Sequence, residues 1–135
     1  MGLRYYDREG KPIDMDRWAE LFASMEYKRV AQHWVRGWMI STVWLGLDHN
    51  FGWGDCPPLI FETMIFAPGD ATDDERSRCD ERQDRYGSEK AALDGHWRAV
   101  DWLCKQLGYS RADLTAPVDA EERWDASLEE LLGDA

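Results

Sequence analysis

Residues 38–66 read WMISTVWLGLDHNFGWGDCPPLIFETMIF, and this stretch decides the fold because it holds two long runs of strand-forming residues. Val, Ile, Thr and aromatic residues are frequent in residues 38–49 and 59–66, whereas the segment between them is rich in Gly and Pro. The first kind of residue favours strands and the second favours turns. The pattern therefore predicts an antiparallel pair that is closed by a loop at residues 50–58.

A third strand is expected just upstream. Residues 29–35 have the same strand-forming composition, and only Arg36 and Gly37 separate them from the next run. Two residues of this kind are typical of a tight hairpin turn.

Two amphipathic helices complete the predicted fold. The first, at residues 15–26, follows Asp14 as its N-cap, and the second, at residues 88–107, begins at Ser88 and ends before Gly108. Both carry apolar residues at helical spacing. The sequence predicts an α+β fold, in which two helices pack on one face of a three- or four-stranded antiparallel sheet.

Charge divides the chain into a domain and a tail. The formal net charge is -11, and residues 110–135 hold eight acidic residues against Arg111 and Arg123, so more than half of the excess lies there. We expect one α+β domain at residues 1–109, with a mobile, charged loop at residues 67–87. An acidic tail would follow at residues 110–135, with a helical piece at residues 121–132.

The same composition narrows the functional class. An acidic chain is repelled by phosphate backbones, so we expect no direct binding to nucleic acid. No segment resembles a signal peptide or a membrane span. Three widely spaced cysteines form no disulfide framework and no zinc motif. These features predict a protein of the cytoplasm that does not bind membranes.

The sheet register predicts which residues share a face. Aligning the two runs across their loop places Glu62 opposite Gly46. The helices would then cover Val43, Leu45, Leu47, Phe61 and Ile65. The other face would carry His33, Trp38, Ile40, Trp44, Asp48, Ile60, Glu62 and Met64. That second face is either an open binding surface or is covered by the tail or by another copy of the chain, which would make a homo-oligomer.

A binding site is predicted where this face meets the loop. Phe51 and Trp53 lie between glycines, and aromatic residues on loops often anchor recognition surfaces, although both could instead fold back as a lid over the sheet. The predicted binding residues are Trp44, Asp48, His49, Asn50, Phe51, Trp53 and Glu62.

An enzyme is the alternative interpretation. Asp48, His49, Glu62 and His96 could form a small metal- or carboxylate-dependent active site. However, no two candidate ligands stand at the spacing of a metal motif, and the sequence contains neither a P-loop nor a dinucleotide-binding motif. We therefore expect neither a metal nor a cofactor, and non-catalytic binding is the leading hypothesis.

Several strings resemble a known group of proteins. STVWLGLDHNFG, PLIFETMIF and RYGSEKAALDGH, together with the start YYDREGKPI, are similar to a family of small, uncharacterised phage and prophage proteins, notably of actinobacteria. The resemblance covers roughly residues 5 to 100, and the acidic tail departs from it. It implies a small accessory phage protein that binds a host or defence protein, or a small ligand, in the host cytoplasm and acts as an inhibitor of defence.

Overall fold

A computed structural model describes residues 4–48, 58–79 and 83–115. The central hairpin of the protein consists of β3 (Arg29–Val35) and β4 (Trp38–Trp44). Its two-residue turn uses Arg36 and Gly37 with φ values of 50° and 89°. Positive φ at both positions matches the twist of antiparallel strands. The predicted hairpin is therefore confirmed.

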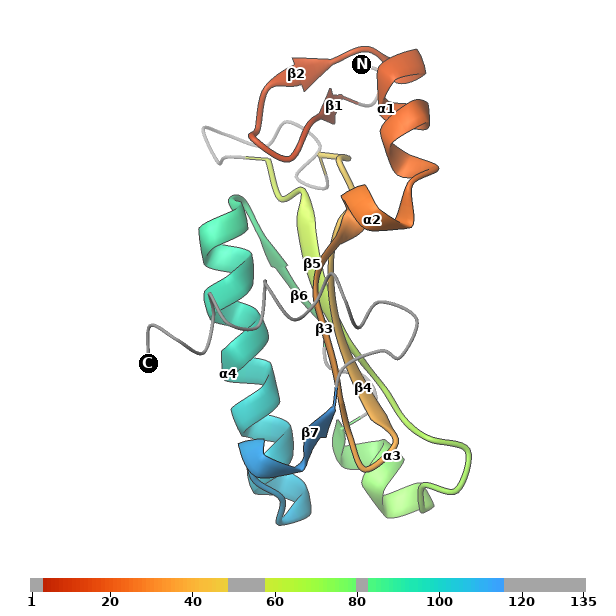
Figure 1. The fold of residues 1–135 in the computed structure, drawn as a ribbon, viewed down its shortest axis with the longest axis vertical. Helices are drawn as coiled ribbons and strands as arrows, with labels where there is room; N and C mark the ends of the chain where they lie inside the picture. The colour runs from red at the N-terminus through yellow and green to blue at the C-terminus, as the bar shows by residue number, and fades with distance from the viewer. Residues whose placement is uncertain (1–3, 49–57, 80–82, 116–135) are drawn as a thin grey trace.

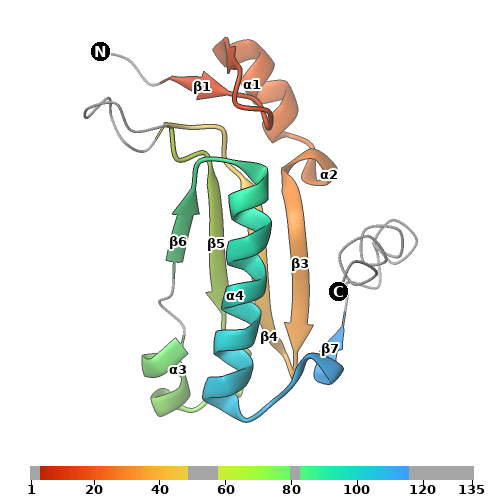
Figure 2. The ribbon, with the colours of Figure 1, turned by 90° about the vertical axis from the view of Figure 1, so that its left-hand side faces the viewer.

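The main sheet has five antiparallel strands in the order β6-β5-β4-β3-β7 (Figure 1). The remaining strands are β5 (Phe61–Phe66), which pairs with β4, and the edge strands β6 (Gln83–Tyr86) and β7 (Leu114–Thr115). The long helix α4 (Glu89–Leu107) runs across one face of the sheet (Figure 2). The predicted α+β class is confirmed, although the described part of the chain has more strands and helices than expected.

The segment predicted as a charged loop contains two of these extra elements. Helix α3 (Asp73–Cys79) and strand β6 both lie within residues 67–87. Thr72 and Glu75 exchange hydrogen bonds at the start of α3, from Thr72 N to Glu75 Oε1 at 2.8 Å and from Glu75 N to Thr72 Oγ1 at 3.1 Å. This reciprocal pattern is a capping box, and its sequence signal T-x-x-E was overlooked in a segment of high charge density.

The predicted register between β4 and β5 is wrong by three residues. Glu62 lies opposite Val43, not opposite Gly46, and Phe61 lies opposite Trp44. The ladder ends at Trp44 because the amides of the next two residues, Leu45 and Gly46, both donate to the carbonyl of Ile60, at 2.7 and 3.2 Å. An odd shift exchanges the two faces of one strand relative to the other.

The core face of β4 is consequently the one that had been predicted to be open, whereas Phe61 and Ile65 of β5 face the core as predicted. Trp38, Ile40 and Trp44 of β4 are buried with Phe61 and Ile65 of β5. Two clusters fill the space under α4. The first is built on Val35, Trp38, Ile40, Ile65, Val100 and Leu103, and the second on Trp44, Ile60, Phe61 and Ala92. Each large side chain buried in this way contributes roughly 1.5–3 kcal/mol.

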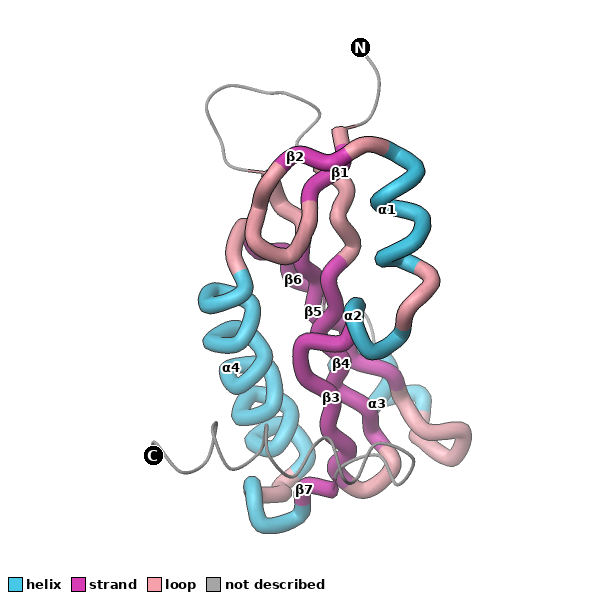
Figure 3. Tube along the Cα trace, turned by 45° about the horizontal axis from the view of Figure 1, so that its top comes forward, coloured by secondary structure: helices cyan, strands magenta, loops and turns pink. Residues whose placement is uncertain are grey.

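A smaller layer caps one end of the main sheet (Figure 3). It contains a two-stranded sheet of β1 (Tyr5–Tyr6) and β2 (Pro12–Ile13), followed by α1 (Met15–Phe22) and α2 (Met25–Lys28). The predicted single helix at residues 15–26 is broken because Ser24 accepts a hydrogen bond from the Tyr27 amide and starts a new turn.

Aromatic packing holds this layer to the sheet. Trp18 stacks on Phe22 with ring centroids 4.7 Å apart, and its indole N–H donates to the Leu45 carbonyl at 2.9 Å. The predicted N-cap Asp14 is confirmed, since its side chain accepts from the Arg17 amide.

The second predicted helix begins and ends where expected. Ser88 caps α4 at its start, and Gly108 follows it with a left-handed φ of 77°. Residues 111–115, which were assigned to the tail, form a 3-10 turn, Arg111–Asp113, and β7 at the edge of the sheet. The helix predicted at residues 121–132 lies outside the described residues. No described helix combines the length and the apolar composition that a membrane span requires.

Candidate functional site

The turn between β1 and β2 presents a charged side chain toward α4. The Asp7 carboxylate accepts from the amides of Glu9 and Lys11, both at 2.9 Å, and Gly10 adopts a left-handed φ of 86°. An aspartate that binds amides just after it stabilises a tight turn. The turn thereby fixes the backbone from which Arg8 extends.

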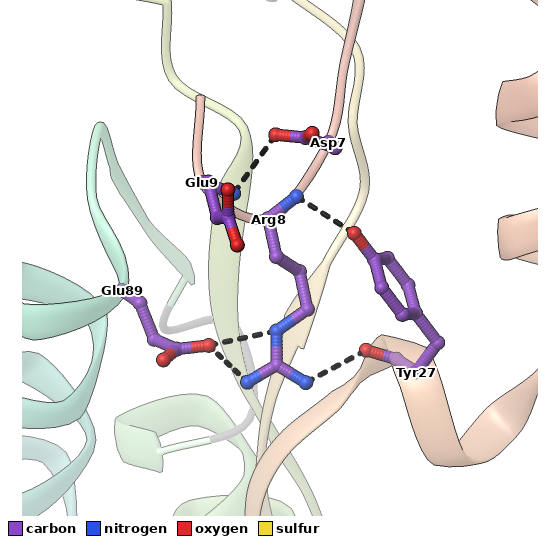
Figure 4. Close-up of polar contacts among 5 residues, drawn as sticks. All are labelled: Asp7, Arg8, Glu9, Tyr27 and Glu89. Carbon is purple, nitrogen blue, oxygen red and sulfur yellow. Dashed lines mark hydrogen bonds and ion pairs between the residues drawn. The ribbon is translucent and has the colours of Figure 1, made fainter. Parts of the chain in front are cut away.

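Arg8 joins three elements that are distant in the sequence (Figure 4). Its guanidinium donates to Glu89 at the start of α4 through Nε, at 2.7 Å, and through Nη2. Its Nη1 donates to the carbonyl of Tyr27 in α2 at 3.0 Å, and its amide donates to the Tyr27 hydroxyl at 2.9 Å. The Arg8 side chain is a quarter exposed and that of Glu89 is 43% exposed, so solvent weakens the ion pair.

These residues line a cleft of about 470 Å³, which we call the N-terminal cleft. Its lining consists of Asp7, Arg8, Glu9, Ile13, Arg17, Leu21, Tyr27 and Glu89. Arg17 is oriented toward Glu20 at 2.9 Å, and Glu9 lies 3.4 Å from the exposed ammonium of Lys11. Both cleft guanidiniums therefore already contact carboxylates.

The structure separates the binding residues predicted from sequence. Trp44 is fully buried, and its indole N–H donates to the Tyr6 carbonyl at 3.1 Å, so it cannot contact a ligand. Asp48 is partly buried, and its amide donates to the Arg4 carbonyl at 3.2 Å, beside β1. His49, Asn50, Phe51 and Trp53 lie outside the described residues.

Glu62 lies on the face of the sheet that points away from α4. Its carboxylate accepts from Gln83 Nε2 at 2.7 Å and from Arg85 Nε at 3.0 Å, both on the neighbouring strand β6. These contacts satisfy a side chain that is nearly buried. The predicted pairing of Glu62 with Gly46 and Asp48 depended on the wrong register.

A chain of buried polar side chains lies under α4. His33 Nδ1 is 2.9 Å from His96 Nε2, and His96 Nδ1 is 2.7 Å from Thr42 Oγ1. Thr42 Oγ1 is in turn 2.6 Å from Thr63 Oγ1. Burial lowers the pKa of His33 to about 4, and burial together with the nearby His33 lowers the pKa of His96 to about 3. Both imidazoles are neutral at pH 7.

The sequence had not linked these two histidines. His96 had been considered as a neighbour of His49, and His33 had been assigned to the open face. The available signal was that His33 and Ile40 share a hairpin position while His96 lies on the apolar stripe of α4. Once the face of β4 that carries Ile40 is known to be the core face, His33 and His96 must lie close together.

Other reactive groups in the described residues form no second centre. Burial raises the pKa of the Cys79 and Cys104 thiols, which makes them poor nucleophiles. Within residues 4–48, 58–79 and 83–115, no three His, Cys, Asp or Glu side chains are grouped to hold a metal ion.

Comparison with known proteins finds no matching family model, no matching curated protein and no matching solved structure. The resemblance to small phage proteins therefore stays a prediction.

Proposed function

We propose that the protein is a non-catalytic binding protein that recognises a basic surface of a protein partner at the N-terminal cleft. The observation that carries this proposal is the Arg8 bridge, which neutralises Glu89 and leaves Asp7 and Glu9 as the remaining acidic residues of the lining.

The charges of the cleft favour a cationic ligand. Three carboxylates line it, those of Asp7, Glu9 and Glu89, against the guanidiniums of Arg8 and Arg17. Arg17 is paired with Glu20 and Glu9 lies 3.4 Å from the Lys11 ammonium, and both partners are outside the lining, so the lining keeps one excess carboxylate. The net charge of -11 on the chain would also attract a basic partner from a distance and raise its association rate.

The lining favours a protein side chain over an apolar small molecule. Small-molecule sites are mostly apolar with a few polar groups. Here Ile13 and Leu21 supply the aliphatic contacts, and charged residues form most of the remaining wall. A Lys or Arg side chain of a partner would place its alkyl stem on these two residues and its charge beside Glu9.

The same end of the molecule carries the start of the predicted recognition loop. Leu47 forms a β-bridge with Tyr5, two residues before Asp7. The described residues that precede Phe51 and Trp53 therefore lie beside β1. We include both aromatic residues in the proposed binding surface.

The enzyme alternative has less support from the geometry. His96 is fully buried under α4, whereas Glu62 lies on the opposite face of the sheet. An acid and a base that act on one substrate must both reach it. These two members of the predicted catalytic set cannot do so in this fold.

The biological setting of the proposal comes from the resemblance to phage proteins. A small acidic protein that binds a host or defence component in the host cytoplasm would act by occupying a basic functional surface of that component. Inhibition would then need no chemistry in this chain.

The test is a binding measurement with a matched pair of charge reversals. The full chain is immobilised, and a host protein that it retains is purified. Calorimetry then measures the affinity of that host protein for the wild type, for Glu9→Lys and for Asp74→Lys. Asp74 is an exposed residue of α3, at the other end of the sheet, and its substitution makes the same charge change. Glu9→Lys should weaken binding at least tenfold, or by about 1.4 kcal/mol, and more so at low salt.

Asp74→Lys should leave the affinity within about twofold of the wild type. Equal losses for both variants would mean that only the overall charge matters. Unchanged affinity in Glu9→Lys would place the interface elsewhere on the protein.

A further inference from the structure

The contact between His33 and His96 joins β3 to α4 inside the core. The two ring nitrogens are 2.9 Å apart, and the series of hydrogen bonds continues from His96 through Thr42 to Thr63. Trp97 packs against both rings, with centroids 4.9 Å from His33 and 5.7 Å from His96. Both histidines are almost completely buried, and the protein supplies hydrogen-bond partners to both ring nitrogens of His96 and to Nδ1 of His33.

Counting hydrogens shows that the neutral pair has two consistent arrangements. In one, His96 Nε2–H donates to His33 Nδ1, while His96 Nδ1 accepts from Thr42 and Thr42 accepts from Thr63. In the other, every bond in the chain points the opposite way. Each arrangement satisfies the three contacts because a neutral imidazole has one donor and one acceptor.

One added proton can be held without breaking a contact. If it binds to His96 Nδ1, the Thr42 hydroxyl rotates, accepts from His96 and donates to Thr63. His96 Nε2–H continues to donate to His33 Nδ1. The cost of this first proton is the burial of one positive charge.

A second proton has no such site. The nitrogen that remains is the acceptor at the contact between the two rings, whichever arrangement the chain starts from. Its protonation puts two N–H groups and two positive charges face to face at hydrogen-bond distance. We propose that the His33–His96 contact is a proton-operated lock, in which double protonation separates α4 from β3.

Other titratable groups lie on the elements that surround the two histidines. Asp84 of β6 lies in register with Thr63 and so shares its face of the sheet. Asp101 of α4 is paired with Arg111, whose guanidinium lies 4.6 Å from the Trp97 ring centroid. Arg111 also keeps the pKa of Asp101 below its usual value, so this carboxylate stays charged in mild acid.

The expected behaviour follows from the histidine pKa values. In the unfolded chain each imidazole binds a proton near its ordinary pKa of about 6.5. The folded state takes up these protons only near pH 4 and pH 3. Stability is therefore fully present above the unfolded pKa and is lost as the pH falls below it.

The experiment measures unfolding equilibria of the full chain between about pH 6 and about pH 5, with hydrogen exchange of α4 amides at the same pH values. Because two protons are linked to unfolding, the unfolding constant should rise by about 50-fold across this pH unit. The amides of α4 should exchange before those of β4. His33→Gln should reduce the rise to about 7-fold. Asp84→Asn, as the control, should leave it near 50-fold.

A wild-type unfolding constant that changes less than about 7-fold would overturn the proposal, as would exchange of α4 no earlier than that of β4. A flattened profile in Asp84→Asn would assign the titration to that carboxylate. The wild-type measurement decides the question even if His33→Gln does not fold.

Discussion

Gly95 of α4 tests the packing of the helix against β6 most directly. In an exposed helix interior, Gly→Ala stabilises by roughly 1 kcal/mol, because alanine restricts the unfolded chain. At Gly95, however, an added Cβ would lie 2.2–2.3 Å from the Cζ, Oη and Cε1 atoms of Tyr86. Excess volume in a packed core costs about 1–3 kcal/mol. We expect the clash to win, so that Gly95→Ala lowers the free energy of unfolding by about 1–2 kcal/mol.

A double-mutant cycle with Tyr86→Ala separates the two effects, using chemical denaturation. Once the ring is removed, Gly95→Ala should stabilise the protein by about 0.5–1 kcal/mol, which is the ordinary helix effect. Gly69→Ala serves as the control because its Cβ would meet nothing within 4 Å. A stabilising Gly95→Ala in the wild-type background would refute the predicted packing of α4 on β6.

Four further outcomes are expected. Gly46→Ala should destabilise by about 2–4 kcal/mol in denaturation, because Gly46 has a φ of +72° and its Cβ would meet Trp44 at 2.4 Å. Thr63→Val should cost about 1–3 kcal/mol by the same assay, since it ends the buried hydroxyl chain. Glu89→Gln should change stability by less than about 1 kcal/mol, because its ion pair is solvent-exposed. Replacing Phe51 and Trp53 by Ala should leave the unfolding midpoint unchanged but weaken partner binding by about 2 kcal/mol in calorimetry; lost stability would indicate a structural lid.

Local features of the fold were predictable because their hydrogen bonds close within a few residues. The Arg36-Gly37 turn and the caps at Asp14 and Ser88 are of this kind, since each depends on the chemistry of one short segment. The capping box at Thr72 was equally local. It was overlooked because the surrounding charge density was interpreted as a loop.

The candidate site was less predictable, since its contacts join distant segments. Arg8 and Glu89 are 81 residues apart and His33 and His96 are 63 residues apart, so no short pattern couples them. Of the predicted binding residues, Trp44 became core and Glu62 became a partner of Arg85.

The sequence by itself determined the three long strands, the ends of the long helix and the acidic character of the chain, because composition and spacing act locally. The tertiary structure alone decided which face of β4 is the core. The two possible faces differ by an odd shift in register, and both bury apolar side chains, so periodicity cannot choose between them. The choice comes from the packing of Trp44 in one cluster with Ala92 and Trp18 and from the Leu45 and Gly46 amides that end the ladder at Ile60. Those contacts exist only after α1, α4 and the sheet have come together.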